Sequence, residues 1–213
     1  KQKTAYEIGT GDWSSDVCSS DLGLDVARFG TDKTALCKRY GNVVTDIEAW
    51  QGLDLMQTVG RVMAEYENLS PSLRPNEILV DSIGVGGGVV DRLRELGAPV
   101  RGINVGEAPA MGKTYMNLRS ELWFKTKAWL EDRSCKLPKN DQLLAELTGI
   151  RYAFTSAGKM KAESKDAMRK RGLKSPDLAD ALCLTMASDA ATALSGASMS
   201  WNRSIKRNLK GIA

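Results

Sequence analysis

The chain has 213 residues, enough for one ordinary domain with a sizeable core but cramped for two. Its composition, 42% hydrophobic and 26% charged with a net charge of +4, is typical of a globular protein and argues against a disordered or fibrous chain. The chain contains no histidine, which excludes serine–histidine and cysteine–histidine hydrolases and imidazole zinc sites. Any acid–base or metal chemistry must therefore use carboxylates, lysines or tyrosines.

The cysteines and the apolar segments place further limits on the class of protein. Cys18, Cys37, Cys135 and Cys183 are widely separated and form no CxxC pair, so we expect free thiols. No apolar run approaches the roughly 20 residues of a membrane span, and the first residues do not resemble a secretory signal. These features predict a soluble intracellular protein.

Residues 7–22, EIGTGDWSSDVCSSDL, are polar and serine-rich, as in a linker. They also resemble the in-frame translation of a common sequencing-library adapter. We therefore predict that residues 1–22 are a non-native leader without ordered structure, and that Asp12, Asp16, Cys18 and Asp21 have no functional role. Without the acidic residues of this stretch the remaining chain is more strongly basic, which favours polyanionic partners.

Three strands joined by hairpins are predicted over residues 22–28, 33–40 and 43–50, with turns at 29–32 and 41–42. Apolar residues at helical spacing then predict a helix over 53–69. The order continues with a strand at 77–81, a helix at 89–96, a strand at 100–105, helices at 118–131 and 141–149, a hairpin at 151–155 and 159–162, and a helix opened by Pro176. This order predicts an α/β domain with a mixed sheet over residues 23–190. From residue 191 to 213 we predict a basic, mobile tail.

Four aspartates are candidates for a functional site, two because they lie in apolar strand segments and two because they lie close together on one helix. Asp25 and Asp81 belong to apolar strand segments, and a buried carboxylate needs a cation, hydrogen bonds or a metal. Asp177 and Asp180 are three residues apart and share one face of the last helix. A cluster of such acids repels itself unless hard divalent cations, which prefer oxygen ligands, neutralise it. Spacing alone leaves open that Asp81 caps a turn, that Asp177 favours a helix N-terminus and that Asp180 pairs with a lysine.

Two glycine-containing segments invite a nucleotide-binding interpretation that their spacing does not support. The sequence GVGGG at 84–88 lacks the dinucleotide spacing and a following ribose-binding acid, so we expect a compact turn near the acidic residues. The sequence GEAPAMGKT at 106–114 has five residues between its glycines where a phosphate loop has four, and Lys113 is expected to be solvated or to face DNA.

A dense basic stretch precedes the last helix. Such a run is usually a solvated face, but beside clustered acids it can also contact phosphates, in which case binding weakens steeply with salt. The predicted phosphate contacts are Lys161, Lys165, Arg169, Lys170 and Arg171, which would be DNA contacts if the polyanionic partner is DNA. Trp50, Trp123 and Trp129 are expected in the core rather than on a base-stacking surface.

Taken in order, the segments GLDVARFGTDKTAL, ILVDSIGVGGGVVDRL, VRGINVGE, ESKDAMRKRG and SPDLADALCLT resemble the nuclease domain of the large terminase subunit of tailed bacteriophages and prophages. The resemblance covers about residues 23–190. It implies a ribonuclease H-like mixed sheet, three hairpinned strands followed by parallel strands, flanked by helices. It also implies two Mg²⁺ or Mn²⁺ ions held by the catalytic residues Asp25, Asp81 and Asp177, with Asp180 as a further ligand and Asp32 as a weaker candidate.

The resemblance further implies an endonuclease that cleaves concatemeric double-stranded DNA by a two-metal mechanism in the host bacterial cytoplasm. Its expected partners are double-stranded DNA, a portal protein, a small terminase subunit and an ATPase domain that would lie upstream. Two alternatives remain open: another ribonuclease H-like nuclease, such as a junction resolvase or a transposase-like protein, and a non-catalytic docking module that contacts the portal or DNA.

Overall fold

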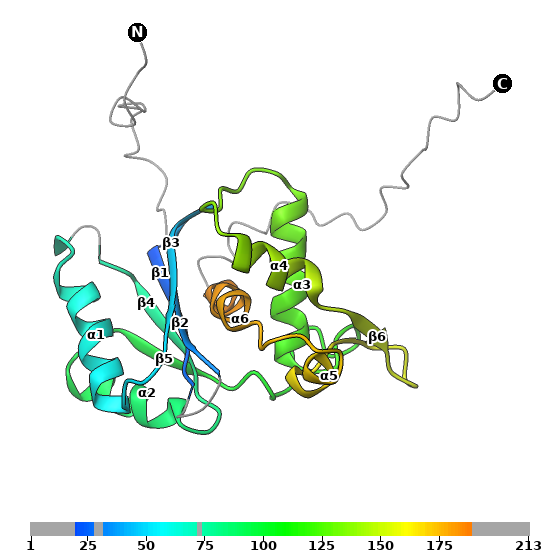
Figure 1. Cartoon of the computed structure of the whole chain (residues 1–213), viewed down its shortest axis with the longest axis horizontal. Coiled ribbons are helices and arrows are strands. Elements are labelled where there is room, and N and C mark those ends of the chain that lie inside the picture. Colours follow the sequence, from blue (N-terminus) through cyan, green and yellow to red (C-terminus); the bar gives the residue numbers. More distant parts are fainter. Residues whose placement is uncertain (1–19, 28–31, 72–73, 189–213) are drawn as a thin grey trace, which may run out of the picture.

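The structure, a computed structural model, describes residues 20–27, 32–71 and 74–188, and its centre is a five-stranded sheet in the order β3-β2-β1-β4-β5 (Figure 1). The strands are β1 (Ser20–Asp25), β2 (Thr34–Tyr40), β3 (Val43–Trp50), β4 (Glu77–Asp81) and β5 (Val100–Ile103). Strands β1, β2 and β3 are antiparallel neighbours, whereas β4 and β5 run parallel to β1. The predicted order of three hairpinned strands followed by parallel strands is confirmed.

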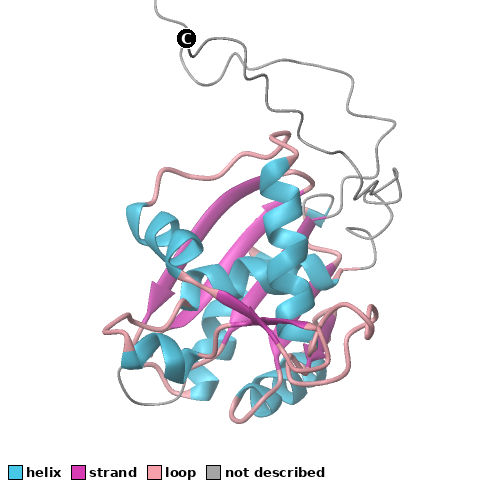
Figure 2. Cartoon of the chain, turned by 90° about the vertical axis from the view of Figure 1, so that its right-hand side faces the viewer, coloured by secondary structure: helices cyan, strands magenta, loops and turns pink. Residues whose placement is uncertain are grey.

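Helices cover both faces of this sheet (Figures 1 and 2). Helices α1 (Leu55–Glu67) and α2 (Gly86–Glu95) pack on one face, and α6 (Asp177–Leu184) packs on the other beneath α3 (Leu118–Glu131) and α4 (Asp141–Gly149). A short helix α5 (Lys165–Lys170) and a two-stranded sheet of β6 (Tyr152–Phe154) and β7 (Met160–Ala162) precede α6, which continues into the 3-10 turn Thr185–Ala187. Within the described ranges, no helix combines the length and apolarity needed to cross a bilayer.

The two-residue alternation of the strands determines which side chains face α6. Leu22 and Leu24 of β1 belong to the apolar core under α1 and α2, so Asp21, Gly23 and Asp25 face the opposite side. In β4 the same core takes Ile78 and Val80, whereas Leu79 joins the core under α6. The register pairs Leu24 with Val80, so Asp25 and Asp81 are the next residues on adjacent parallel strands. Both carboxylates therefore lie at the same sheet edge, towards α6.

Strand β1 begins at Ser20, before the predicted start of the domain at residue 23. Asp21 is fully buried and accepts a hydrogen bond from Arg39 Nη2 at 2.9 Å, while Arg39 also donates to Thr185 and to the Gly41 carbonyl. Because this pairing satisfies the buried charge, the expected lack of structure is wrong for Ser20, Asp21 and Leu22. The predictions for residues 1–19 and for the tail at 191–213 concern residues outside the described ranges.

Two other boundaries differ from the sequence predictions. Helix α2 begins at Gly86 rather than Val89. Its first residue approaches the end of β4 so closely that a Cβ on Gly86 would lie 1.8 Å from the Asp81 carbonyl oxygen, and only glycine permits this approach. Helix α5 was not predicted; it is capped by Ser164, whose Oγ accepts from the Ala167 N–H. Cys37, Cys135 and Cys183 are free thiols, as expected.

Substituting Gly23 tests the close packing of α6 on β1. A Cβ on Gly23 would lie 2.1 Å from the Ala181 carbonyl oxygen, so Gly23→Ala is expected to lower the free energy of unfolding by about 3 kcal/mol. Gly60, exposed within α1, has nothing within 4 Å of its Cβ position, so Gly60→Ala is the matched control and is expected to stabilise by up to about 1 kcal/mol. Urea denaturation measures both; equal effects would contradict the packing.

Candidate functional site

The four predicted aspartates lie around one end of α6 and the adjacent sheet edge. Asp25 and Asp81 end strands β1 and β4, and Asp177 and Asp180 occupy the first turn of α6. Asp25, Asp81 and Asp180 line a cleft of about 360 Å³, while Asp177 lines a neighbouring pocket. The fold thus brings acids from three separate elements into one region, a possibility that the sequence left open.

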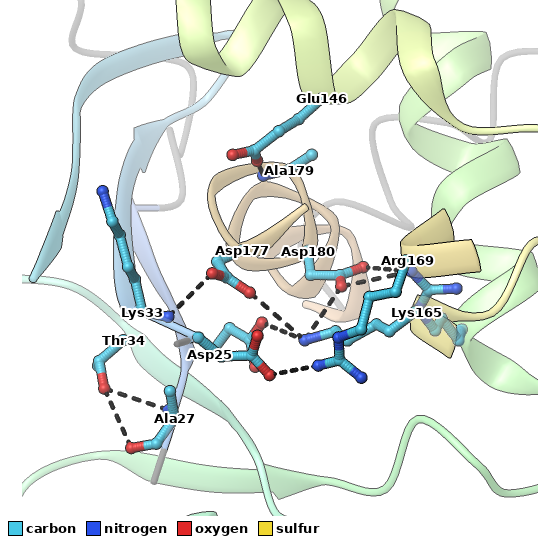
Figure 3. Close-up of polar contacts among 12 residues, drawn as sticks. Asp25, Ala27, Lys33, Thr34, Glu146, Lys165, Arg169, Asp177, Ala179 and Asp180 are labelled. Atoms are coloured by element: carbon cyan, nitrogen blue, oxygen red, sulfur yellow. Dashed lines mark hydrogen bonds and ion pairs between the residues drawn. The ribbon is translucent and has the colours of Figure 1, made fainter. Parts of the chain in front are cut away.

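The ammonium group of Lys165 lies among these acids. Its Nζ is 2.9 Å from Asp25 Oδ2, 3.4 Å from Asp180 Oδ2 and 3.8 Å from Asp177 Oδ1. In Figure 3 the three carboxylates point towards Lys165, which enters from α5. Lys165, predicted as a DNA contact, is thus paired with the acids. Among the described residues, no three side chains of aspartate, glutamate or cysteine stand close enough to enclose a metal ion. The carboxylates are gathered around the ammonium instead.

Burial dominates the electrostatics of the acids. It raises the pKa of Asp25 to about 7, although Lys165 lowers that pKa, and the charges of Asp180 and Asp177 raise it further. Burial also raises the pKa of Asp81 and of Asp177 above the ordinary value. Burial alone would lower the pKa of Lys165, but the surrounding carboxylates, Asp25 foremost, raise it above its usual value. The site therefore concentrates negative charge that a cation or the protonation of a carboxyl group must offset.

Asp180 and Asp177 differ in how many hydrogen bonds their carboxylate oxygens accept. Asp180 Oδ1 accepts from Trp123 Nε1 at 2.7 Å, and Arg119 Nη2 lies 3.1 and 3.3 Å from its two oxygens, so α3 holds this carboxylate. Asp177 Oδ2 accepts from the Lys33 N–H at 2.9 Å, but its buried Oδ1 has no hydrogen-bond partner among the described residues. Asp177 Oδ1 is thus within 3.8 Å of the Lys165 ammonium but accepts no hydrogen bond from a described residue, whereas Asp180 is largely engaged.

The two remaining acids considered from sequence are also engaged in contacts. Asp81 Oδ1 accepts from the Ile83 N–H at 3.1 Å, so Asp81 caps the turn after β4 while it lines the cleft. Asp32 pairs with Arg169 Nη2 at 2.6 Å and lies in the neighbouring pocket beside Asp177. Asp81 therefore both stabilises the turn after β4 and lines the cleft, whereas Asp32 lies outside the cleft.

The predicted DNA-contacting cations fall into two groups. Arg169 pairs with Asp32 and Asp166, and Arg171 pairs with Glu163 at 2.6 Å and donates to the Gly149 carbonyl. Lys161 and Lys170 are exposed, and no hydrogen bond or ion pair to another described residue holds them; Lys161 also lines the cleft. These two lysines are thus free to contact a phosphate.

Sequence reasoning missed the role of Glu146, which lies on α4. Pro176, the residue at the N-cap of α6, offers no side-chain acceptor, and Glu146 Oε2 accepts from the Ala179 N–H at 2.9 Å instead (Figure 3). Burial raises the pKa of Glu146, partly offset by these bonds. No local signal identifies such a cap, because it comes from another helix. Trp50 and Trp123 are buried and Trp129 packs against the core, as predicted.

The strand order and the helices on both faces define a ribonuclease H-like α/β fold with an acidic cleft at one sheet edge. The nuclease domain of the large terminase subunit of bacterial virus Sf6 has a similar fold, with a TM-score of 0.68 and 22% identity over 80% of this chain and 88% of that one. The large terminase nuclease of thermophilic phage G20c, solved with bound magnesium, gives a TM-score of 0.61 and 18% identity over 79% of this chain and 80% of that one. The nuclease domain of Thermus phage P74-26 large terminase gives a TM-score of 0.59 and 16% identity over 79% of this chain and 78% of that one.

These similarities confirm the predicted fold. No protein-family model and no curated protein sequence matches the chain.

Removing the ammonium group tests its place among the acids. We expect Lys165→Met to lower the melting temperature of the metal-free protein, because Asp25, Asp177 and Asp180 lose their shared cation. The same change removes a competitor for the carboxylates, so Mn²⁺ should bind at least about tenfold more tightly by calorimetric titration. Lys170→Met on the same helix is the control and should alter neither quantity. Weaker Mn²⁺ binding by the Lys165 variant would contradict the interpretation.

The cap from Glu146 predicts a difference between two substitutions. Glu146→Ala leaves the first turn of α6 without its acceptor and should cost about 1 kcal/mol in urea denaturation. It should also weaken Mn²⁺ binding, because Asp177 belongs to that turn. Glu146→Gln retains an acceptor oxygen and should restore most of both properties. If glutamine behaves as alanine does, the negative charge rather than the cap is what matters.

Proposed function

We propose that this chain is the metal-dependent DNA endonuclease domain of a phage DNA-packaging terminase large subunit. The observation that carries the proposal is that Asp25 and Asp81, on adjacent parallel strands, line one cleft with Asp180 of α6. Asp177 lies in the same helical turn as Asp180, and the fold is shared with solved terminase nucleases. The substrate is concatemeric double-stranded DNA, and the reaction is hydrolysis of a phosphodiester bond.

The residues of the site fit a divalent cation. All the donors are carboxylate oxygens, which Mg²⁺ and Mn²⁺ prefer. Asp177 Oδ1 is buried without a hydrogen bond among the described residues, and burial raises the pKa values of Asp25, Asp81 and Asp177. In our proposal Asp25, Asp81 and Asp177 hold two Mg²⁺ or Mn²⁺ ions, and Asp180 is a further ligand. When bound, such ions lower the pKa of an attacking water and stabilise the departing 3′ oxygen.

The other side chains of the site orient the acids and the DNA. Arg119 and Trp123 hold Asp180 against α3, and the Lys33 N–H orients Asp177. Lys165 neutralises the acids before a metal binds, and its movement from Asp25 frees that carboxylate. Lys161, at the cleft, and Lys170 contact the phosphate backbone, with Arg169 and Arg171 next to them. Cleavage should therefore weaken as salt rises.

The assembly around this domain forms the wider part of the proposal. An ATPase domain preceding the nuclease would drive DNA translocation, and a portal protein and a small terminase subunit would bring the complex to its DNA in the host bacterial cytoplasm. The fold similarity to terminase nucleases supports this setting over the alternatives drawn from sequence.

Plasmid cleavage in the presence of Mn²⁺ tests the site. Asp25→Asn and Asp81→Asn keep the side-chain size but remove a charged ligand, and each should reduce the cleavage rate at least about 100-fold. Asp91→Asn, an exposed acid on α2, is the control and should cleave as the wild type does. Metal-dependent cleavage that persists in both site variants would refute the assignment.

Two further measurements separate the alternative functions. A docking module without catalysis would show no Mn²⁺ binding by calorimetry and no cleavage in any variant. A junction resolvase would cleave branched DNA in preference to linear duplex, whereas the proposed function predicts cleavage of linear duplex.

A further inference from the structure

Four aromatic rings form a row from the interior of the domain to its surface. Tyr115, only 2% exposed, stacks on Phe124 at 5.4 Å between ring centroids, and Phe124 meets the edge of Tyr152 at 5.3 Å. Tyr152 in turn contacts Phe154 at 6.0 Å. The outer two rings are 56% and 66% exposed, which is unusual for large aromatic side chains. The row therefore ends in two solvent-facing rings supported from below.

The outer rings lie on a hairpin with a fixed register. Tyr152 pairs with Ala162 and Phe154 with Met160, so the two rings share one face of the hairpin, while Lys161 lies on the other. Backbone bonds hold β7 to the segment before α3, with Met160 donating to Thr114 and accepting from Met116. The backbone beneath the rings is thus anchored to the rest of the domain, which reduces the conformational freedom lost on binding.

The charge of the hairpin favours a polyanion over an apolar protein surface. Residues 151–162, RYAFTSAGKMKA, carry Arg151, Lys159 and Lys161 and contain no acid. Lys161 lines the cleft together with Asp25 and Asp81, so strand β7 borders the acidic site on one side and supports the aromatic face on the other. A DNA strand whose phosphate entered the cleft would therefore lie beside this hairpin.

A pocket of about 510 Å³ adjoins the aromatic face. Phe124, Tyr152, Leu130 and Ile150 form its apolar walls, and Arg133 and Arg151 lie among its lining residues. Glu131, an acid in the lining, is already paired with Lys127 at 2.6 Å. Apolar walls beside two guanidinium groups suit a nucleobase and its phosphate.

We propose that Tyr152 and Phe154 are a stacking surface for unpaired nucleobases of the DNA strand held at the cleft. The inference rests on the proposed nuclease function and adds a substrate preference: DNA with unpaired bases beside the cut, as at a frayed or already nicked site. Every nucleobase offers a π-face, so the contact is independent of sequence. The rings contribute to binding and positioning of DNA, whereas the acids carry the chemistry.

Binding of single-stranded DNA in EDTA tests this surface without cleavage. The whole chain is titrated into a fluorescent oligonucleotide containing 2-aminopurine, whose emission falls when it stacks on an aromatic ring. Tyr152→Leu and Phe154→Leu keep apolar bulk but remove the π-face, and each should weaken binding about tenfold and abolish the quenching. Tyr152→Phe should retain both. Met56→Ala, an exposed apolar residue on α1, is the control and should leave both unchanged.

The outcomes separate this inference from the nuclease proposal. Quenching and affinity that persist in both leucine variants overturn the stacking surface, as does an equal loss of affinity for intact duplex and single-stranded DNA. Wild-type protein that shows no quenching overturns it too, and an apolar protein partner would then explain the exposed rings. Because no metal is present, stacking by a wild type that never cleaves plasmid with Mn²⁺ would refute the nuclease proposal alone.

Discussion

The contact of helix α6 with strand β1 at Gly23 determines the geometry of the acidic cleft. The Ala181 carbonyl approaches so closely that a Cβ on Gly23 would lie 2.1 Å from it, so no other residue fits without movement of α6. This approach sets the first turn of α6, with Asp177 and Asp180, beside the ends of β1 and β4. A bulkier residue at Gly23 would push the helix outward and separate its acids from Asp25. The same contact thus contributes to both stability and the site.

Placing acids this close requires compensation, and two kinds of cation can supply it. Lys165 provides one positive charge and contacts Asp25, Asp177 and Asp180, which allows the metal-free domain to fold with these carboxylates buried. A lysine cannot supply the charge of two divalent ions, and its long stem lets it withdraw towards solvent. Arg119 and Trp123, by contrast, hold Asp180 through directed hydrogen bonds from α3. In the proposed nuclease, the site would combine an acid held by directed hydrogen bonds with a cation on a long, unbranched stem, which would have to leave the carboxylates when a metal binds.

The strands, the main helices and the positions of the acids were predictable from sequence because their signals are local. Short apolar segments marked β1 and β4, and Asp25 and Asp81 were conspicuous as charges within them. The contacts that organise the site were not predictable, because Lys165 meets Asp25 across 140 residues and Glu146 caps α6 from a separate helix. The start of β1 was missed for another reason: the resemblance of residues 7–22 to adapter sequence concealed the pairing of Asp21 with Arg39. Nor did the basic run before α6 indicate which cations were paired, since Arg169 and Arg171 meet acids elsewhere in the fold.

Helix α3 links the aromatic hairpin to the acids. Arg119 and Trp123 hold Asp180 from one side of the helix, and the neighbouring residue Phe124 supports Tyr152 from another. The segment just before α3 also bonds to strand β7 through Met160, so the hairpin and the acid are positioned by the same piece of backbone. A nucleobase on the aromatic face and a phosphate at the cleft would then both be positioned by contacts with α3 and the segment before it. Because catalysis is sensitive to misplacement of about 1 Å, such shared positioning favours correct placement of the scissile bond more than two independently mobile contacts do.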